Sequence, residues 1–215
     1  MAYPGIDDCL SPAPSDAEIA GVVSKYGVGA EYVLAVNLTN VRKNARKLCQ
    51  AFAELLKTRC NPLALVFAGG WNLQECNLWR MASEAGIADH VHVTGYVTRQ
   101  ELFCLYHGAR AFCMPSLYEG FGMPVAEAMA CGIPVVASGN GAMAEVAGDC
   151  GILIDPEDIY SIRDGLSHAL DNTEARERIM AVGKARATRF IWRQAAEVIA
   201  QRLKAALLQP AGISI

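Results

Sequence analysis

The chain has 215 residues, of which 53% are hydrophobic and 19% are charged. This composition supports one globular domain with a buried core and excludes the disordered and fibrous classes, because domains commonly run to about 100–200 residues. The formal net charge is −3 and no basic run with interleaved aromatic residues occurs, which argues against nucleic acid as a partner.

The eight cysteines form no Cys-x-x-Cys pair and have no histidine at zinc-ligand spacing. We therefore interpret them as reduced thiols and expect a cytoplasmic protein. No stretch of about 18 apolar residues occurs, and the first residues lack the pattern of a signal peptide. The sequence predicts neither export nor a membrane-spanning helix.

Residues 1–20 are rich in Pro, Ser and Asp and show no hydrophobic period. We interpret them as a linker that leads into a domain of residues 21–208, with residues 209–215 as a tail.

Six apolar runs of strand length follow. They are continuous rather than alternating, which is typical of strands that are buried on both faces of a parallel sheet. The runs span residues 32–36, 63–69, 90–96, 109–115, 133–138 and 151–155.

Amphipathic segments separate these runs, at about 43–58, 73–86, 98–107, 123–131 and 158–170. Beyond the last run, residues 158–208 are predicted as two or three helices with breaks near Asn172 and Arg189. Strands that alternate with helices predict right-handed βαβ units. The expected fold is α/β: a Rossmann-like, doubly wound parallel sheet of about six strands, with helices on both faces and a helical C-terminal tail.

The loop after residues 109–115 carries the most informative chemistry. Glycines at 120 and 122 allow a close approach of the backbone, and Pro124 suits the first turn of a helix whose N-terminus attracts anions. Glu119 precedes the glycines and Glu127 lies one turn into the helix among small apolar residues. A carboxylate there needs hydrogen-bond donors, and sugar hydroxyls are such donors.

These residues alone leave a plainer interpretation open. Glu127 could face solvent, and Glu119 could only interact favourably with the helix dipole.

The segment PSLYEGFGMPVAEAMACGIPVVAS, residues 115–138, resembles the signature of the family 4 retaining glycosyltransferases. Members consist of two Rossmann-like halves that form the GT-B fold. The resemblance covers roughly residues 3–205, all of it the C-terminal half, and implies that residues 1–20 lead from a missing N-terminal acceptor-binding domain. The matching segments are 3–7, 32–55, 90–158 and the F-x-W at Phe190 and Trp192.

The resemblance also implies roles for individual residues. Glu119 would contact hydroxyls of the donor sugar, and Glu127 would bind the ribose hydroxyls. Lys43 would neutralise the diphosphate as it leaves, so that Lys43 and Glu119 are the expected catalytic residues. Backbone N–H groups would approach the sugar and the diphosphate, from Gly120, Phe121, Gly122 and Met123.

One departure from the family concerns the phosphate clamp. Many members carry Gly-Arg several residues before the lysine, where this chain has Asn37-Leu38-Thr39. Arg42 is the candidate replacement, and the alternative is that Arg42 is an ordinary cation at a helix start.

Three further positions resemble nucleotide contacts of the family. Gly70 follows the second run beside Gly69, although turn formation explains these glycines equally well. Tyr96 and Val97 resemble the segment whose backbone reads the base, and a core position is the alternative for Tyr96.

The resemblance implies transfer of a sugar, with retained anomeric configuration, from a UDP-, GDP- or ADP-sugar to a hydroxyl acceptor. No Asp-x-Asp pattern occurs, so we expect no metal and no cofactor besides the nucleotide sugar. The expected partners are the nucleotide sugar and the N-terminal acceptor-binding domain, and peripheral membrane association through the missing half stays open. Without that half, turnover should be weak.

Two alternatives remain: a sugar-nucleotide epimerase of similar fold and a non-catalytic nucleotide-sugar-binding module. A dehydrogenase half is disfavoured because no Gly-x-Gly-x-x-Gly follows the first run.

Overall fold

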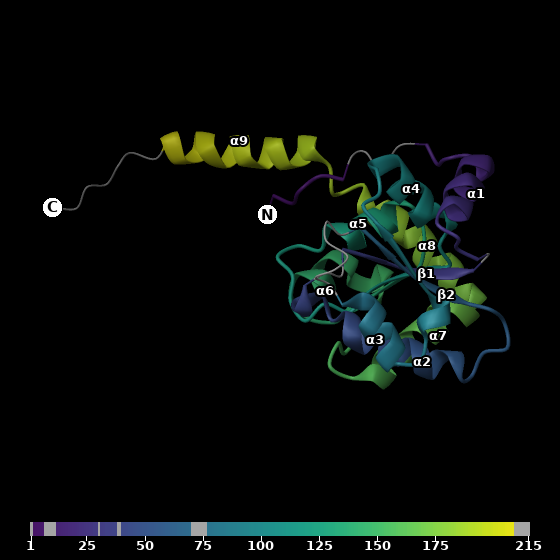
Figure 1. Ribbon diagram of the computed structural model, residues 1–215. Coiled ribbons are helices and arrows are strands. Elements are labelled where there is room, and N and C mark those ends of the chain that lie inside the picture. Colours follow the sequence, from purple (N-terminus) through teal and green to yellow (C-terminus); the bar gives the residue numbers. More distant parts are fainter. Residues whose placement is uncertain (1, 7–11, 30, 38–39, 70–76, 209–215) are drawn as a thin grey trace.

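The computed structural model describes residues 2–6, 12–29, 31–37, 40–69 and 77–208, which fold around one six-stranded sheet (Figure 1). The strands lie in the order β3-β2-β1-β4-β5-β6, and all neighbouring pairs are parallel. The order reverses between β1 and β4, which is where ligands bind in doubly wound sheets. The predicted fold class is confirmed. The strands are β1 (Tyr32–Val36), β2 (Ala64–Ala68), β3 (Val91–Gly95), β4 (Ala111–Met114), β5 (Val135–Ser138) and β6 (Ile152–Ile154).

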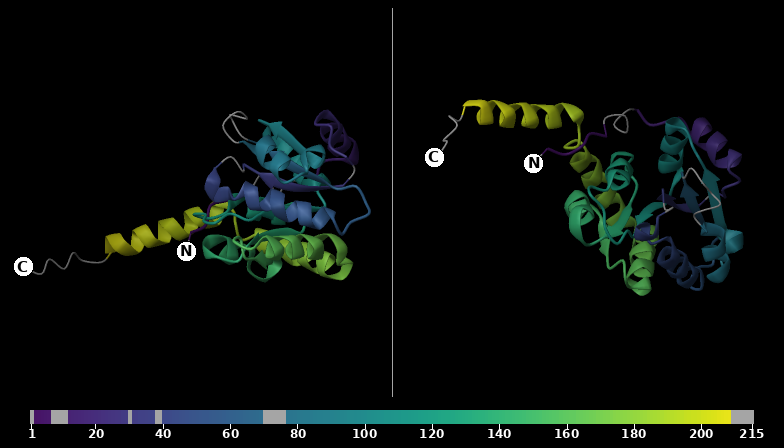
Figure 2. Two further views of the ribbon diagram at one scale, coloured as in Figure 1. Left: turned by 60° about the horizontal axis from the view of Figure 1, so that its bottom comes forward. Right: turned by 60° about the vertical axis from the view of Figure 1, so that its left-hand side comes forward.

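Helices cover both faces of the sheet (Figures 1 and 2). Alternate residues of β1 face opposite cores: Leu34 packs with helices α4 to α6, and Val33 packs with α2, α3 and α7. This two-sided burial explains why the strands read as continuous apolar runs. The α-helices are α1 (Asp16–Lys25), α2 (Ala45–Leu56), α3 (Leu78–Glu84), α4 (Arg99–Gly108), α5 (Met123–Ala130), α6 (Gly141–Ala147), α7 (Ile159–Asp171), α8 (Thr173–Ala187) and α9 (Trp192–Leu208).

The predicted helix positions agree with these elements to within a few residues. The C-terminal region forms three helices, and the breaks at Asn172 and around Arg189 are as predicted. The first residues of the segment predicted at 73–86 lie outside the described residues. The described residues also form the short 3-10 helices η2 (Val41–Lys43), η3 (Ala88–His90) and η4 (Gly148–Cys150).

Helix α1 begins inside the segment for which the sequence predicts a linker. The Ser15 side chain accepts a hydrogen bond from the Glu18 amide, and the Glu18 carboxylate accepts one from the Ser15 amide. This capping box starts a helix that packs on α4, where Lys25 pairs with Glu101. None of the residues of α1 is fully buried, so the helix carries no strong apolar stripe.

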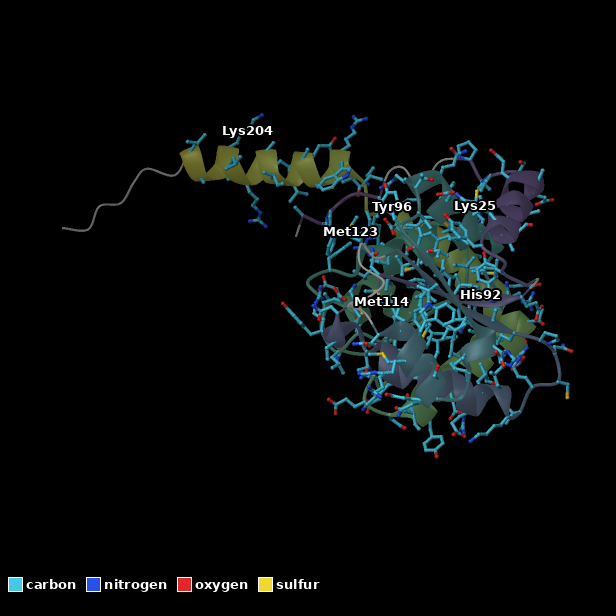
Figure 3. All side chains as sticks on the ribbon, viewed as in Figure 1. Lys25, His92, Tyr96, Met114, Met123 and Lys204 are labelled. Atoms are coloured by element: carbon cyan, nitrogen blue, oxygen red, sulfur yellow. The ribbon has the colours of Figure 1, made fainter. Side chains whose placement is uncertain are left out.

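Helix α9 extends away from the sheet in every view, with Lys204 far along it (Figures 2 and 3). Its exposed apolar side chains include Trp192, Ile199, Leu203 and Leu207. Among the described helices, none has the length and hydrophobicity needed to cross a bilayer.

Candidate functional site

Three charged side chains meet where the strand order reverses. Lys43 Nζ lies 2.8 Å from Glu119 Oε1, and Arg42 Nη1 lies 2.8 Å from Glu119 Oε2. The side chains of Lys43 and Glu119 are only 10% and 9% exposed, whereas that of Arg42 is 41% exposed. We call these three residues the Arg42–Lys43–Glu119 cluster.

Two loops that follow neighbouring strands build this cluster. Helix η2 follows β1, and its start is capped by the Asn40 side chain, which accepts from the Arg42 amide at 3.0 Å. The Leu117 amide donates to the Arg42 carbonyl at 2.8 Å, which joins η2 to the loop after β4. Because β1 and β4 are adjacent, their carboxyl ends bring these loops together.

Asn44 fixes the end of η2 in a way that the sequence interpretation missed. It adopts a left-handed conformation with φ of 62°, and its buried side-chain amide donates to the carbonyls of Pro115 and Pro156. Asparagine tolerates this conformation better than most residues. The visible signal was an Asn directly before a helix, which is too common to identify such a role.

The electrostatics of the cluster favour a bound anion. Burial alone raises the pKa of Glu119, but the hydrogen bonds from Lys43 and Arg42 outweigh this effect and lower the pKa below its usual value. The carboxylate is therefore ionised at neutral pH. Two cations against one carboxylate leave the cluster with a surplus positive charge.

The glycine-rich loop leads from the cluster into α5, between Met114 at the end of β4 and Met123 at the start of the helix (Figure 3). Gly122 is the N-terminal cap of α5 and has a φ of +92°, and a Cβ there would lie 3.2 Å from Met143 Cγ. The cap therefore requires glycine, and it offers the helix N-terminus no capping side chain. This arrangement is suited to binding an anionic group.

Glu127 lies farther along α5 and has a different environment. One carboxylate oxygen accepts a hydrogen bond from the Tyr106 hydroxyl at 3.0 Å, and burial raises the pKa of Glu127. Tyr106 was not identified from the sequence, where it is one aromatic residue of a helix and its hydroxyl could not be assigned a partner.

A cavity of about 490 Å³ opens beside Glu127. Small-molecule sites commonly have volumes of roughly 300–1,000 Å³. The cavity is mainly apolar and contains a few polar groups, which is the usual composition of a site for a ring-bearing ligand. Its lining includes Pro14, Arg99, Gln100, Phe103, Tyr106 and Glu127.

The remaining candidate residues differ in their exposure to solvent. Tyr96 is 63% exposed, so the alternative of a core position for Tyr96 is wrong, whereas Val97 is buried. Gly70 lies outside the described residues. A Cβ at Gly69 would lie 2.3 Å from Asn37 Oδ1, so the geometry of the turn explains the glycine at 69.

Sequence comparison relates the chain to sugar-transferring enzymes. Residues 24–186 match the family described as glycosyl transferases group 1. O-antigen chain mannosyltransferase B of Escherichia coli is 38% identical over 181 residues, which are 83% of this chain and 47% of that protein. The MMP alpha-(1->4)-mannosyltransferase of Mycolicibacterium hassiacum is 39% identical over 131 residues, 59% of this chain and 32% of that protein. The chain thus spans about half or less of the length of these relatives.

Structure comparison supports the same fold. A glycosyltransferase from Rickettsia africae superposes with a TM-score of 0.85 at 14% identity, over 97% of this chain and 57% of that one. The Anabaena protein HepE, in a complex with UDP and glucose, superposes with a TM-score of 0.80 at 22% identity, over 94% of this chain and 55% of that one.

Proposed function

This chain belongs to the group 1 glycosyl transferases, and we propose that it is the donor-binding half of a retaining enzyme of family 4. The reaction transfers a sugar from a nucleoside diphosphate sugar to a hydroxyl acceptor. The observation that carries the proposal is the Arg42–Lys43–Glu119 cluster, which lies beside the glycine-capped start of α5. The residue roles and the retained configuration come from the family resemblance.

The cluster suits the diphosphate and the sugar. As the bond to the sugar breaks, negative charge develops on the leaving diphosphate, and Lys43 and Arg42 stabilise it more in the transition state than in the ground state. Arg42 takes the place of the missing Gly-Arg of the phosphate clamp. A carboxylate has about four acceptor positions, so Glu119 can accept from sugar hydroxyls while it remains paired with both cations.

The cavity beside Glu127 suits the nucleoside. Tyr106 occupies one side of the Glu127 carboxylate, and the remaining acceptor positions can receive the two ribose hydroxyls. The exposed Tyr96 and the backbone of Val97 precede α4, whose first residue, Arg99, lines the cavity, and this placement supports their role at the base.

The proposal extends to partners and location. The acceptor binds to an N-terminal domain, and peripheral membrane association would arise through that half. The cations of the cluster supply the charge that a metal would otherwise provide, so the donor is the one cofactor-like molecule required. A cytoplasmic location fits the described cysteines, all of which are free thiols.

The family match favours a transferase over an epimerase or a non-catalytic module. The names of the two sequence relatives favour a mannosyl donor, so GDP-mannose belongs among the first ligands to test.

Calorimetric titration with UDP, GDP, ADP, UDP-glucose, GDP-mannose and ADP-glucose tests the proposal. We expect the chain to bind one nucleoside diphosphate and its sugar. Lys43→Met should weaken that affinity by roughly 10- to 100-fold, because a hydrogen bond to a charged group stabilises by about 1.5–3 kcal/mol. Glu127→Ala should weaken it by about as much.

Lys57→Met is the matched control, because Lys57 is exposed at the end of α2 and pairs locally with Glu54, three residues earlier. Its affinity should equal that of the wild type. Failure of the wild type to bind any of the six ligands would refute the donor-binding assignment.

A further inference from the structure

Three aromatic rings from distant parts of the chain pack together, and one of them belongs to the glycine-rich loop. The ring centroids of Tyr3 and Phe121 are 5.8 Å apart, those of Tyr3 and Phe190 are 5.5 Å apart, and those of Phe121 and Phe190 are 5.4 Å apart. Both contacts of Phe190 are edge-to-face. We call Tyr3, Phe121 and Phe190 the aromatic triad.

Hydrogen bonds hold the two chain segments that carry Tyr3 and Phe190 in place. The Tyr3 hydroxyl donates to Glu145 Oε1 at 2.6 Å, and the Ile6 amide donates to the Phe190 carbonyl at 2.8 Å. Ile6 and Phe190 are 1% and 3% exposed. The start of the chain therefore lies against the segment that leads into α9, as all views of the ribbon show (Figures 1 and 2).

Helix α6 connects the hydrogen bond of Tyr3 to the glycine-rich loop. This helix carries Glu145, the acceptor for Tyr3, and Met143, which lies against Gly122. Arg186 of α8 donates to the carbonyls of Glu145 and Val146 and anchors the end of α6. Phe121 and Gly122 are thus contacted by three segments that are far apart in the sequence: the start of the chain, helix α6 and the segment before α9.

We propose that Tyr3 and Phe190 are positioning residues for the donor loop, residues 120–123. They hold the side chain of Phe121, and thereby fix the direction of the neighbouring backbone N–H groups toward the sugar-diphosphate part of the donor. The inference rests on the proposed function, which assigns those N–H groups to the donor.

A selective effect on ligand binding follows from this geometry. Preorganised backbone donors bind well because the loop loses less conformational entropy when the ligand binds. The triad supports the loop before α5, whereas the cavity beside Glu127 is lined by residues 12–14, α1, α4 and the later part of α5. Loss of a triad ring should therefore weaken binding of the diphosphate sugar and spare binding of the nucleoside.

Titration of four variants tests this selectivity, with the nucleoside monophosphate and the diphosphate sugar of the preferred base as probes: GMP and GDP-mannose, or UMP and UDP-glucose. Tyr3→Ala and Phe190→Leu should weaken diphosphate-sugar affinity by roughly threefold to tenfold and leave monophosphate affinity unchanged. Tyr3→Phe, which keeps the ring and loses the hydrogen bond to Glu145, should show a smaller loss. Tyr160→Ala is the control, because Tyr160 is an exposed aromatic residue on α7.

A second measurement needs no ligand. Backbone order parameters of Phe121, Gly122 and Met123 should be about 0.85 in the wild type and fall toward about 0.6 in Tyr3→Ala, with no change in Tyr160→Ala. Equal loss of affinity for both probes, or an unchanged loop, would overturn the positioning role. If the wild type binds no nucleotide while the order parameters still fall, the loop contact stands and the donor function is what fails.

Discussion

Glu119 and Glu127 are eight positions apart, and their surroundings shift the pKa values of their carboxyl groups in opposite directions. Hydrogen bonds from Lys43 and Arg42 lower the pKa of Glu119 in spite of its burial. Burial raises the pKa of Glu127, and its bond from Tyr106 only partly offsets that effect. Glu119 is thus stabilised as an anion before any ligand binds. Glu127 is costly as an anion until donors such as ribose hydroxyls reach it.

A pH-dependent stability follows for Glu127. Its folded-state pKa is raised above the usual 4.5, so the folded state holds its proton to higher pH than the unfolded state. The free energy of unfolding therefore falls as pH rises from about 4.5 through the raised pKa. We expect Glu127→Gln to abolish this fall and to be more stable than the wild type at pH 8, by roughly 0.5–2 kcal/mol, although it should bind the donor less tightly.

Urea denaturation at pH 4.5, 6 and 8 measures this effect. The difference between Glu127→Gln and the wild type should grow with pH, whereas Glu174→Gln on the exposed start of α8 should track the wild type. A difference that is constant across pH would contradict the role of the buried charge.

Among the elements, the loop between β4 and α5 contains two glycines, and the fold requires only one of them. The left-handed conformation of Gly122 is needed to start α5 after β4, and α6 closes off the space for a side chain there. Apart from the two chain neighbours of Gly120, no described residue has an atom within 4 Å of the position that a Cβ at residue 120 would take, and the φ of Gly120 is not positive. Only the first of these two glycines is therefore required by the fold.

Gly122→Ala should lower the free energy of unfolding by about 1–3 kcal/mol, because it combines backbone strain with a contact to Met143. Gly120→Ala should change the stability by less than about 0.5 kcal/mol. If residue 120 approaches the donor, Gly120→Ala should nevertheless weaken nucleotide-sugar affinity. Chemical denaturation and titration of the same two variants distinguish these effects, and equal stability losses would contradict the assignment.

The elements also show what sequence patterns can predict. β1, β2, β4 and β5 are buried on both faces, so their composition alone identifies them. Helix α1 was missed because none of its residues is fully buried, although Ser15-x-x-Glu18 is a recognisable capping box. Short elements with weak periodicity need such end signals.

The candidate site was predictable only in part for a related reason. Glu119, Glu127 and Lys43 lie in motifs that can be read along the chain. The ion pair between Lys43 and Glu119, the bond from Tyr106 and the two bonds of Asn44 join residues that are 21 to 112 positions apart. Only the strand order brings them together, and no local pattern encodes these contacts.

On the scale of the whole molecule, the chain divides into a packed body and a projecting helix. The body extends to Ala195, which is buried at 6% exposure. Every side chain from Ile199 to Leu207 is exposed, and the helix leaves the body in all views (Figures 1 and 2). The aromatic triad lies at the junction, so the beginning of α9 is tied to the donor loop whereas the rest of the helix is not.

A truncation after Glu197 tests this division, because it removes the exposed part of α9 and keeps Phe190 and Ala195. We expect the melting temperature to change by less than about 2 °C, since the removed side chains bury little surface and a loss of 1 kcal/mol shifts a domain of this size by about 2–4 °C. Nucleotide affinity should be unchanged, in contrast to Phe190→Leu, which alters the triad itself. Calorimetric melting and titration of both variants provide the measurement. A fall of more than about 5 °C on truncation would show that α9 contributes to the folded body, because only buried contacts could produce a loss of that size.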